Sequence, residues 1–515
     1  MVYHLIYVYF SLPQQIIKMF DPVSILLSVV VFLFLLNTFF DNKRNVYKNF
    51  PPGPRSLPLI GNLHNMLMRR QKPHLTFHEM AKEYGPVFSI QLGSEKIVVL
   101  CGYEAVKEAL INYADEFSER PVIPMMTEIS KGHGLIFSQG DTWKVLRRFT
   151  LSSLRDFGMG KKTIENKIQE EGDALVEVFE SYKGQPFENQ MIMNAAVANI
   201  IVSILLDTRF EYNSPTLLKL MKLVNDSVRL LSSPMALLFN AFPSILRRIP
   251  GSHQRVFENS YEMRNFFTET FVKRREELDM NDQRNLIDAF LVKQKEEKPA
   301  PQMFFHNENL LDVVSTLFGA GMETTSTTLR WSIMLMMKYP EIQQKVQEEI
   351  DRVIGSAQPL VEHRKQMPYT DAVINETQRF GNIAPTAIPH ATTRDLTFRG
   401  YFLPKGTHVI PVLSSVLQDP TFFAKPLEFY PEHFLDSEGK FVKIDAFLPF
   451  SAGRRSCLGE NLAKMELFLF FTILMQKFTF KPPPGEEVDL TPNSGVTTSP
   501  LPHKICAFPR EQILA

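Results

Sequence analysis

The strongest constraint on this chain is a short stretch near its C-terminal end, residues 450–459, where one cysteine lies between two glycines. The glycines allow the backbone to approach a flat ligand closely, and Arg454 and Arg455 lie within three residues of Cys457. An apolar helical pattern over 462–475 follows, and amide groups at a helix N-terminus favour an anionic sulfur. We therefore predict that Cys457 is a thiolate ligand of a haem iron, an arrangement that favours O–O bond cleavage. The alternative is a glycine turn with a buried free thiol.

The composition indicates a globular protein with a large core, because 44% of the 515 residues are hydrophobic and 22% are charged. Lys plus Arg and Asp plus Glu are equal at 56 each, so no net field favours nucleic acid, which is not a predicted partner. The three cysteines are odd in number and far apart, which gives no disulfide framework and indicates a reducing compartment. Cys101 and Cys506 lie in apolar, strand-like runs and are expected to be buried and inert.

The N-terminal region contains a membrane signal. Residues 22–40 are uncharged and rich in Val, Leu and Phe, and they are long enough to form one transmembrane helix. The basic residues that follow predict a cytosolic location for the rest of the chain, and the rival interpretation, a cleaved secretory signal, lacks a small-x-small site after the run. Residues 1–21 are expected to be an N-terminal extension, either lumenal or upstream of a start at Met19, and residues 41–62 a basic and proline-rich linker.

The remaining residues, 63–515, are predicted to form a single domain that is mainly α with a small β lobe. Apolar runs at 86–92 and 96–100 flank a Gly-Ser turn and predict a β-hairpin. Helical patterns dominate from about 140 to 355, and strand signals return in the C-terminal part, at 396–402, 407–412 and 478–480.

A long central helix is predicted over 307–338, and two glycines, Gly319 and Gly321, interrupt it. Each glycine costs about 1 kcal/mol relative to alanine, so something must compensate. One explanation is close helix packing. The other is that small residues let the helix lie against a haem face, where Glu323 and Thr324 deliver protons during O–O scission; an acid and an alcohol linked through water suit such a task.

A further candidate pair, Glu376 and Arg379, lies on one face of a predicted helix about 80 residues before Cys457. As a bare pattern it predicts a surface ion pair. Its position before the cysteine stretch, together with the segment 431–434 that contains His433, gives the pair more weight than the bare pattern does.

Several motifs together resemble the cytochrome P-450 family. Residues 450–459 fit F-x-x-G-x-R-x-C-x-G, residues 320–325 fit A-G-x-E-T-T, residues 376–379 fit E-x-x-R, and residues 51–54 fit the P-P-G-P segment of membrane-bound members. The runs at 143–149, 157–161, 368–373 and 451–455 are similar to family 2 of the vertebrate microsomal enzymes, and those at 414–419 and 466–471 to the fish subfamily K.

The resemblance implies a cytochrome P-450 fold that holds haem b. Haem carries two propionates, on which cationic or hydrogen-bonding residues are expected to converge. The resemblance implies that these residues are Arg120, Trp143, Arg147, His390 and Arg455, with Cys457 as the axial iron ligand. The family closes its E-x-x-R brace with an arginine, where this chain has His433. We expect the imidazole or another group to close the brace here.

The resemblance also implies an unspecific monooxygenase that inserts one oxygen atom of O2 into a lipophilic substrate. Electrons are expected from NADPH through NADPH-cytochrome reductase, with cytochrome b5 as a second candidate donor and the endoplasmic reticulum membrane as the location. Basic residues near 144–162 suit docking of an acidic electron donor. Two rivals remain: a haem-thiolate isomerase that uses peroxide substrates, against which Glu323 and Thr324 argue, and a non-catalytic haem-binding membrane protein.

The predicted substrate pocket is mainly apolar or small, without a buried cation to bind a carboxylate. Besides Thr324, its candidate residues are Ile123, His133, Leu135, Phe318, Ala320, Ile383, Ala384, Ala387, Ile388, Val496 and Thr497. A medium-chain fatty acid, a steroid or a foreign aromatic compound would fit this description. The resemblance to subfamily K favours fatty-acid hydroxylation.

Overall fold

The computed structural model describes residues 27–32, 49–68, 72–299 and 301–510. The predicted extension, most of the predicted anchor and residues 41–48 of the predicted linker therefore lie outside the described residues; only 27–32, which are helical, represent the anchor. Among the described helices, none has both the length and the apolar character needed to cross a bilayer.

Helices make up most of the described chain, as the sequence predicts. They are α3 (Leu63–Met68), α4 (Pro73–Tyr84), α5 (Tyr103–Lys107), α6 (Pro124–Ser130), α7 (Gly140–Asp156), α8 (Lys162–Ser181), α9 (Gln190–Leu206), α10 (Pro215–Leu231), α11 (Pro234–Ala241), α12 (Pro243–Leu246), α13 (Ser252–Glu276), α14 (Leu286–Glu296), α15 (Asn307–Lys338), α16 (Pro340–Val353), α17 (Pro368–Gly381), α18 (Leu413–Leu417) and α19 (Glu460–Lys477). Short helical turns of other pitch are η1 (Glu108–Asn112), η2 (Val361–Gln366), η3 (Pro431–Phe434) and η4 (Gly453–Arg455).

The strands form small sheets. They are β1 (Val87–Leu92), β2 (Glu95–Leu100), β3 (Phe187–Glu188), β4 (His390–Ala391), β5 (Leu396–Phe398), β6 (Tyr401–Leu403), β7 (His408–Pro411), β8 (Phe478–Lys481), β9 (Pro492–Ser494), β10 (Thr498–Pro500) and β11 (Lys504–Pro509). One sheet has the order β1-β2-β7-β4, and its β1–β2 pair is the predicted hairpin, with Val87 opposite Leu100. The others are β3-β11-β8, β5-β6 and β9-β10.

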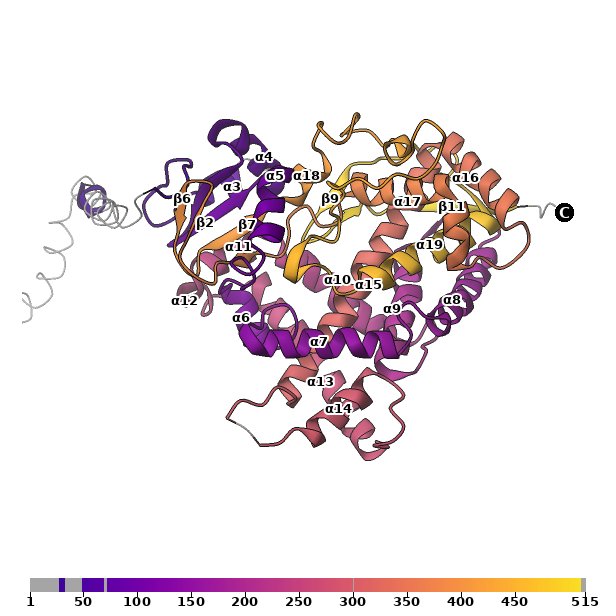
Figure 1. The fold of residues 1–515 in the computed structure, drawn as a ribbon, viewed down its shortest axis with the longest axis horizontal. Coiled ribbons are helices and arrows are strands. Elements are labelled where there is room, and N and C mark those ends of the chain that lie inside the picture. Colours follow the sequence, from indigo (N-terminus) through magenta and orange to yellow (C-terminus); the bar gives the residue numbers. More distant parts are fainter. Residues whose placement is uncertain (1–26, 33–48, 69–71, 300, 511–515) are drawn as a thin grey trace, which may run out of the picture.

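The β lobe lies to one side of a larger helical body (Figure 1). In the lobe, β1 and β2 place Phe88 and Val99 in a core that α4 covers with Phe77 and Met80. Alternate residues of these strands, such as Val98, pack in a second core, because successive side chains of an extended chain point to opposite faces of the sheet. The mainly helical architecture with a small β lobe is confirmed.

The helix α15 runs through the centre of the helical body (Figure 1) and contacts α9, α13, α17, α19 and β10. Its partner α9 is apolar on all sides, which is typical of a fully buried helix. A Cβ atom on Gly321 would lie 2.7 Å from Cδ1 of Ile201 in α9. Close packing against α9 therefore accounts for this glycine, while the haem-face role of the segment stays a prediction.

Candidate functional site

The cysteine loop, residues 450–459, contains the helical turn η4 and packs against the helical turn η1. Cys457 lies between η4 and α19, and its N–H donates to the carbonyl of Phe450 at 3.0 Å. Gly453 has a φ of 74°, and a Cβ atom there would lie 1.8 Å from the carbonyl oxygen of Leu110 in η1. Only glycine allows this approach, so the first glycine of the stretch fixes the loop against η1.

The thiol of Cys457 is accessible although protein surrounds it. Its side chain is exposed, yet desolvation by the surrounding protein raises its pKa. The N–H groups of Gly459 and Glu460 and the charge of Arg147 lower this pKa, as the helix N-terminus predicts, but desolvation outweighs them. A metal cation at the sulfur would reverse that balance, because a coordinated thiol loses its proton.

Three arginines form a group that we call the arginine cluster: Arg120, Arg147 and Arg455. Arg120 donates to the carbonyls of Ile136 at 3.1 Å and of Ile388 and Pro389 at 2.8 Å. Further bonds run from Arg455 to the carbonyls of Ser118 at 2.7 Å and Ser138 at 2.8 Å, and from Arg147 to that of Ser456 at 2.9 Å. All of these acceptors are backbone carbonyls, and within the described residues no carboxylate forms an ion pair with the cluster.

The arginine cluster carries uncompensated positive charge. Desolvation is the largest cause that lowers the pKa of all three arginines, and that of Arg455 falls to about 9. Repulsion from Arg147 also lowers the pKa of Arg120 and of Arg455. The negative charge of Glu119 acts in the opposite direction and raises the pKa of Arg455. Buried charges are normally paired, so this cluster fits a dianionic group such as the two propionates of haem.

Trp143 and His390 complete the surroundings of the cluster. The guanidinium of Arg455 lies 3.9 Å from the ring centre of Trp143, a cation–π contact that fixes its plane. Nδ1–H of His390 donates to the carbonyl of Phe117 at 2.6 Å, and burial lowers its pKa to about 3. His390 is therefore neutral, and its Nε2 becomes a donor only on protonation, which adjacent carboxylates would favour.

One face of α15 is open in the middle of an otherwise buried segment. Ala320 and Thr324 are exposed, whereas Met322 and the residues from Thr325 to Met337 are buried. The two exposed residues lie one helical turn apart, and the Thr324 hydroxyl donates to the carbonyl of Ala320 at 2.8 Å. These two residues are accessible although the residues that follow them in α15 are packed.

Glu323 reaches away from this face to the β9–β10 hairpin. Its Oε1 accepts from the hydroxyl of Thr497 at 2.9 Å and from that of Thr327 at 3.5 Å. Desolvation raises the pKa of Glu323, while the Thr497 bond and the charge of Arg330 lower it. Thr497 was predicted as a pocket residue, and its bond to Glu323 joins segments that no sequence motif connects.

A continuous series of contacts joins Glu323 to Cys457. From Thr497 the backbone continues to Thr498, whose N–H donates to the carbonyl of Ile383 at 2.8 Å. Five residues after Ile383, the carbonyl of Ile388 accepts a hydrogen bond from Arg120 of the arginine cluster. Another member of the cluster, Arg147, donates to the carbonyl of Ser456, the residue before Cys457. The series connects the segments that carry the predicted proton donor Glu323, the propionate ligands and the iron ligand; that they form one site stays a prediction.

The predicted pocket residues differ in exposure, and that they line one pocket stays a prediction. The exposed ones are Ala320, Ile388 and Val496; the partly or fully buried ones are Ile123, Leu135, Ile383, Ala384, Ala387 and Thr497. Phe318 is fully buried against Phe267 of α13. His133 lies edge-to-face with His306, 5.0 Å between ring centres, at the start of α15 and about 20 Å along the helix from Ala320.

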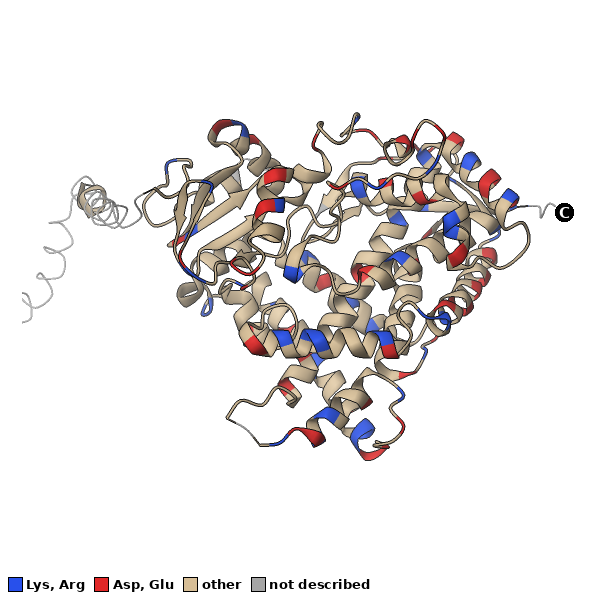
Figure 2. Ribbon diagram, viewed as in Figure 1, with Lys and Arg blue, Asp and Glu red and all other residues tan. Residues whose placement is uncertain are grey.

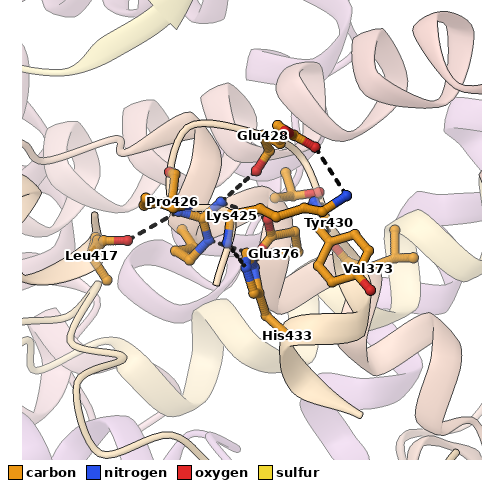
Figure 3. A network of polar contacts seen from close by, with 10 residues as sticks. Val373, Glu376, Leu417, Lys425, Pro426, Glu428, Tyr430 and His433 are labelled. Carbon is orange, nitrogen blue, oxygen red and sulfur yellow. Dashed lines mark hydrogen bonds and ion pairs between the residues drawn. The ribbon is translucent and has the colours of Figure 1, made fainter. Parts of the chain in front are cut away.

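A second polar network, the brace, consists of Glu376, Arg379 and His433 (Figure 3). The carboxylate of Glu376 and the guanidinium of Arg379 form two bonds of 2.7 Å, and both side chains are fully buried. Arg379 also donates to carbonyls of the loop before η3, those of Pro426 and Glu428, at 2.7 Å each. The interpretation as a surface ion pair is therefore wrong.

His433 occupies the position where the family pattern has arginine. Its Nε2 accepts from the N–H of Lys425 at 3.0 Å, so its proton lies on Nδ1, which donates to Oε2 of Glu376 at 3.2 Å. The imidazole thus closes the brace in its neutral form. One carboxylate, one guanidinium and one neutral ring give a network without net charge.

A mainly helical fold that holds a cysteine beside a buried, unpaired arginine cluster defines a haem protein with thiolate ligation. The family model of cytochrome P-450 matches residues 51–507. The chain is 50% identical to cytochrome P-450 2K4 of Oncorhynchus mykiss over 465 residues, which is 89% of this chain and 92% of that protein. It is 46% identical to cytochrome P-450 2K1 of the same fish over 505 residues, 97% and 100% of the two chains, and 45% identical to cytochrome P-450 2F3 of Capra hircus over 490 residues, 95% and 99%.

This chain belongs to the cytochrome P-450 family. Its similarity to family 2 and to the fish subfamily K is confirmed. The protein is a haem-thiolate monooxygenase, and its electrons come from NADPH through a redox partner. Bound haem supplies the redox centre at which O2 is activated. The arginine cluster, Trp143 and His390 fit its propionates, and Cys457 fits its iron.

Proposed function

We propose that this protein is a membrane-bound monooxygenase of the endoplasmic reticulum that inserts one oxygen atom of O2 into a lipophilic substrate. The observation that carries this proposal is the continuous series of contacts from Glu323 on α15 to Cys457. It combines an acid, an open helix face and an anion site within one interior.

In the proposed mechanism, Glu323 and Thr324 hold and move the protons that O–O scission consumes. Desolvation raises the pKa of Glu323, which favours the protonated carboxyl that can act as a proton donor. Thr324 lies on the open face, one residue further along α15.

For the substrate we favour a fatty acid over a steroid or a xenobiotic. The exposed residues around the open face are apolar or small, namely Ala320, Ile388 and Val496. Such a surface binds an acyl chain or a fused ring by burial of apolar area. The similarity to subfamily K supports the fatty acid.

The proposed electron donor is NADPH-cytochrome reductase, with cytochrome b5 as a second donor. Exposed cations lie along α7 and at the start of α8 (Figure 2): Lys144, Arg148, Arg155, Lys161 and Lys162. The same helix carries Arg147, which contacts the cysteine loop through Ser456. An acidic donor on this surface would therefore dock close to the thiolate.

The proposed organisation is an extension at 1–21, a single-pass anchor at 22–40, a linker at 41–62 and one catalytic domain at 63–515 that faces the cytosol. The apolar run and the basic residues after it support this arrangement. Carbonate extraction of microsomes tests it: the full chain is expected to stay in the membrane, and a chain that starts at residue 41 is expected to be released in part.

A reduced carbon monoxide difference spectrum tests the thiolate site. The full chain is expected to show the red-shifted Soret band of thiolate ligation, and Cys457→Ala to lose it. Cys101→Ala, which removes a buried cysteine in the β lobe, is the matched control and should keep the band. A wild-type spectrum without that band would contradict the proposal. A panel of lauric acid, testosterone and an alkoxyaromatic compound, with reductase present, then tests the substrate class.

A further inference from the structure

The β9–β10 hairpin touches the proposed proton donor as well as the substrate side of the site. Val496 at its tip is exposed, whereas the adjacent Thr497 is buried and donates to Oε1 of Glu323 at 2.9 Å. Within the described residues the two hydroxyls bind Oε1 of Glu323, and Oε2 has no hydrogen-bond partner. One oxygen of this carboxyl is therefore held by the protein, and the other is the candidate site of proton transfer.

Other contacts hold the hairpin in place without the Thr497 hydroxyl. Nε1–H of Trp331 donates to the carbonyl of Thr498 at 3.0 Å, and the N–H of Thr498 donates to the carbonyl of Ile383 at 2.8 Å. Both contacts use the backbone of the hairpin. The bond from Thr497 to Glu323 is therefore not required to place the hairpin against α15.

We propose that Thr497 is the positioning residue of Glu323, so that the hairpin which borders the substrate also orients the carboxyl that supplies protons. This inference rests on the proposed role of Glu323. Thr497 acts only through Glu323 and is not itself a catalytic residue.

The charges around Glu323 support this assignment. Desolvation is the largest cause of the raised pKa of Glu323; among the described residues the charged group that also shifts it is Arg330, two turns further along α15, and the hydroxyls that do so are Thr497 and Thr327. The hydroxyl of Thr497 is the closer donor, 2.9 Å against 3.5 Å for Thr327. Because its bond lowers the pKa of Glu323, its removal is expected to raise that pKa further.

The consequence can be measured without a known substrate. In the holoenzyme with reductase, O2 + NADPH + H⁺ gives H2O2 + NADP⁺ when the O–O bond survives. O2 + 2 NADPH + 2 H⁺ gives 2 H2O + 2 NADP⁺ when the bond is split. The ratio of H2O2 formed to NADPH oxidised therefore reports proton delivery. Loss of one positioned hydrogen bond is expected to move the partition toward peroxide about fivefold.

The chain offers a closely matched set of variants. Thr497→Val replaces the hydroxyl by a methyl group of similar size and is expected to raise the ratio of H2O2 formed to NADPH oxidised. Thr497→Ser keeps a hydroxyl and should show the wild-type ratio. Thr498→Val is the control, since its buried Oγ1 has no partner within the described residues. It should leave the ratio unchanged.

An infrared titration gives a readout besides turnover. The C=O stretch of protonated Glu323, assigned by its loss in Glu323→Gln, is expected to titrate at higher pH in Thr497→Val and at the wild-type pH in Thr498→Val. If Glu323→Gln leaves the peroxide ratio unchanged, the proposed role of Glu323 fails. If Glu323→Gln raises the ratio but Thr497→Val changes neither readout, Glu323 keeps its role and the inference about Thr497 is overturned.

Discussion

Arg379 and Arg455 are both buried arginines, but only Arg379 has a carboxylate partner that neutralises its charge. Arg379 has a carboxylate partner with two bonds of 2.7 Å, and backbone carbonyls take its other donors. Arg455 has only carbonyl partners, two other guanidiniums near it, and a pKa lowered to about 9. The brace is satisfied by the protein alone, whereas the arginine cluster is not.

This difference separates a structural group from a binding group by physical means. A buried charge without a counter-ion opposes folding, so a protein keeps several of them only where a bound anion compensates. The brace should therefore contribute to stability whether or not haem is present. The cluster should contribute only when haem is bound.

Arg379→Ala should have the largest effect on the free energy of unfolding. It leaves the carboxylate of Glu376 buried without its cation, which costs about 3–5 kcal/mol. Urea unfolding followed by circular dichroism measures this loss. Arg352→Ala removes an arginine that is 69% exposed and should cost less than about 1 kcal/mol. Equal losses in the free energy of unfolding for Arg379→Ala and Arg352→Ala would show that the brace does not contribute more to stability than an exposed ion pair.

Asp312 on α15 provides an intermediate case, because its partner Arg264 is 3.6 Å away and its Oδ2 has no partner within the described residues. Desolvation raises its pKa from 3.8 to about 7. The folded state then binds a proton that the unfolded state has lost, so the free energy of unfolding falls as pH rises from about 4 to about 7.

Asp312→Asn should abolish that slope and stabilise the protein at pH 8 by roughly 3 kcal/mol. Urea unfolding at pH 5 and pH 8 measures both effects. A variant that is equally destabilised at the two pH values would show that Asp312 is ionised and paired like Glu376.

Arg455→Met should weaken haem binding without lowering the stability of the haem-free protein. Charge-assisted hydrogen bonds contribute about 1.5–3 kcal/mol each, so the affinity for haem should fall about tenfold to a hundredfold. The stability of the haem-free protein should stay the same or rise, because one unpaired cation is removed. Soret titration and urea unfolding of the haem-free chain check this pair of results. A loss of haem-free stability as large as that of Arg379→Ala would contradict it.

His433→Ala should have the smallest effect on the brace. It removes one bond to Glu376 and the acceptor for the N–H of Lys425, for about 1–3 kcal/mol. Lys425→Ala changes only the exposed side chain and leaves that N–H in place, so thermal unfolding should be nearly unchanged. A His433→Ala variant as stable as Lys425→Ala would show that the imidazole merely fills space.

Features within one segment could be predicted from the sequence. The central helix over 307–338 and the β1–β2 hairpin follow from periodicity, and the glycine of the cysteine stretch indicates a close approach. The identity of the approached atom, the carbonyl of Leu110, could not be predicted, because a turn such as η1 has no clear sequence code. The bond from Thr497 to Glu323 joins residues 174 positions apart, and only the folded chain determines it.

The clamp of Gly453 on Leu110 has a consequence for biosynthesis. The two ends of this contact belong to segments made at different times; the nearby pair Asp115 and Arg454 is 339 residues apart. At 5–20 residues per second, roughly 20 to 70 s pass between their appearance at the ribosome. The contact between the cysteine loop and η1 therefore cannot form until nearly the whole chain has been made. Haem loading is thus expected after translation, and pulse-labelled nascent chains should bind none.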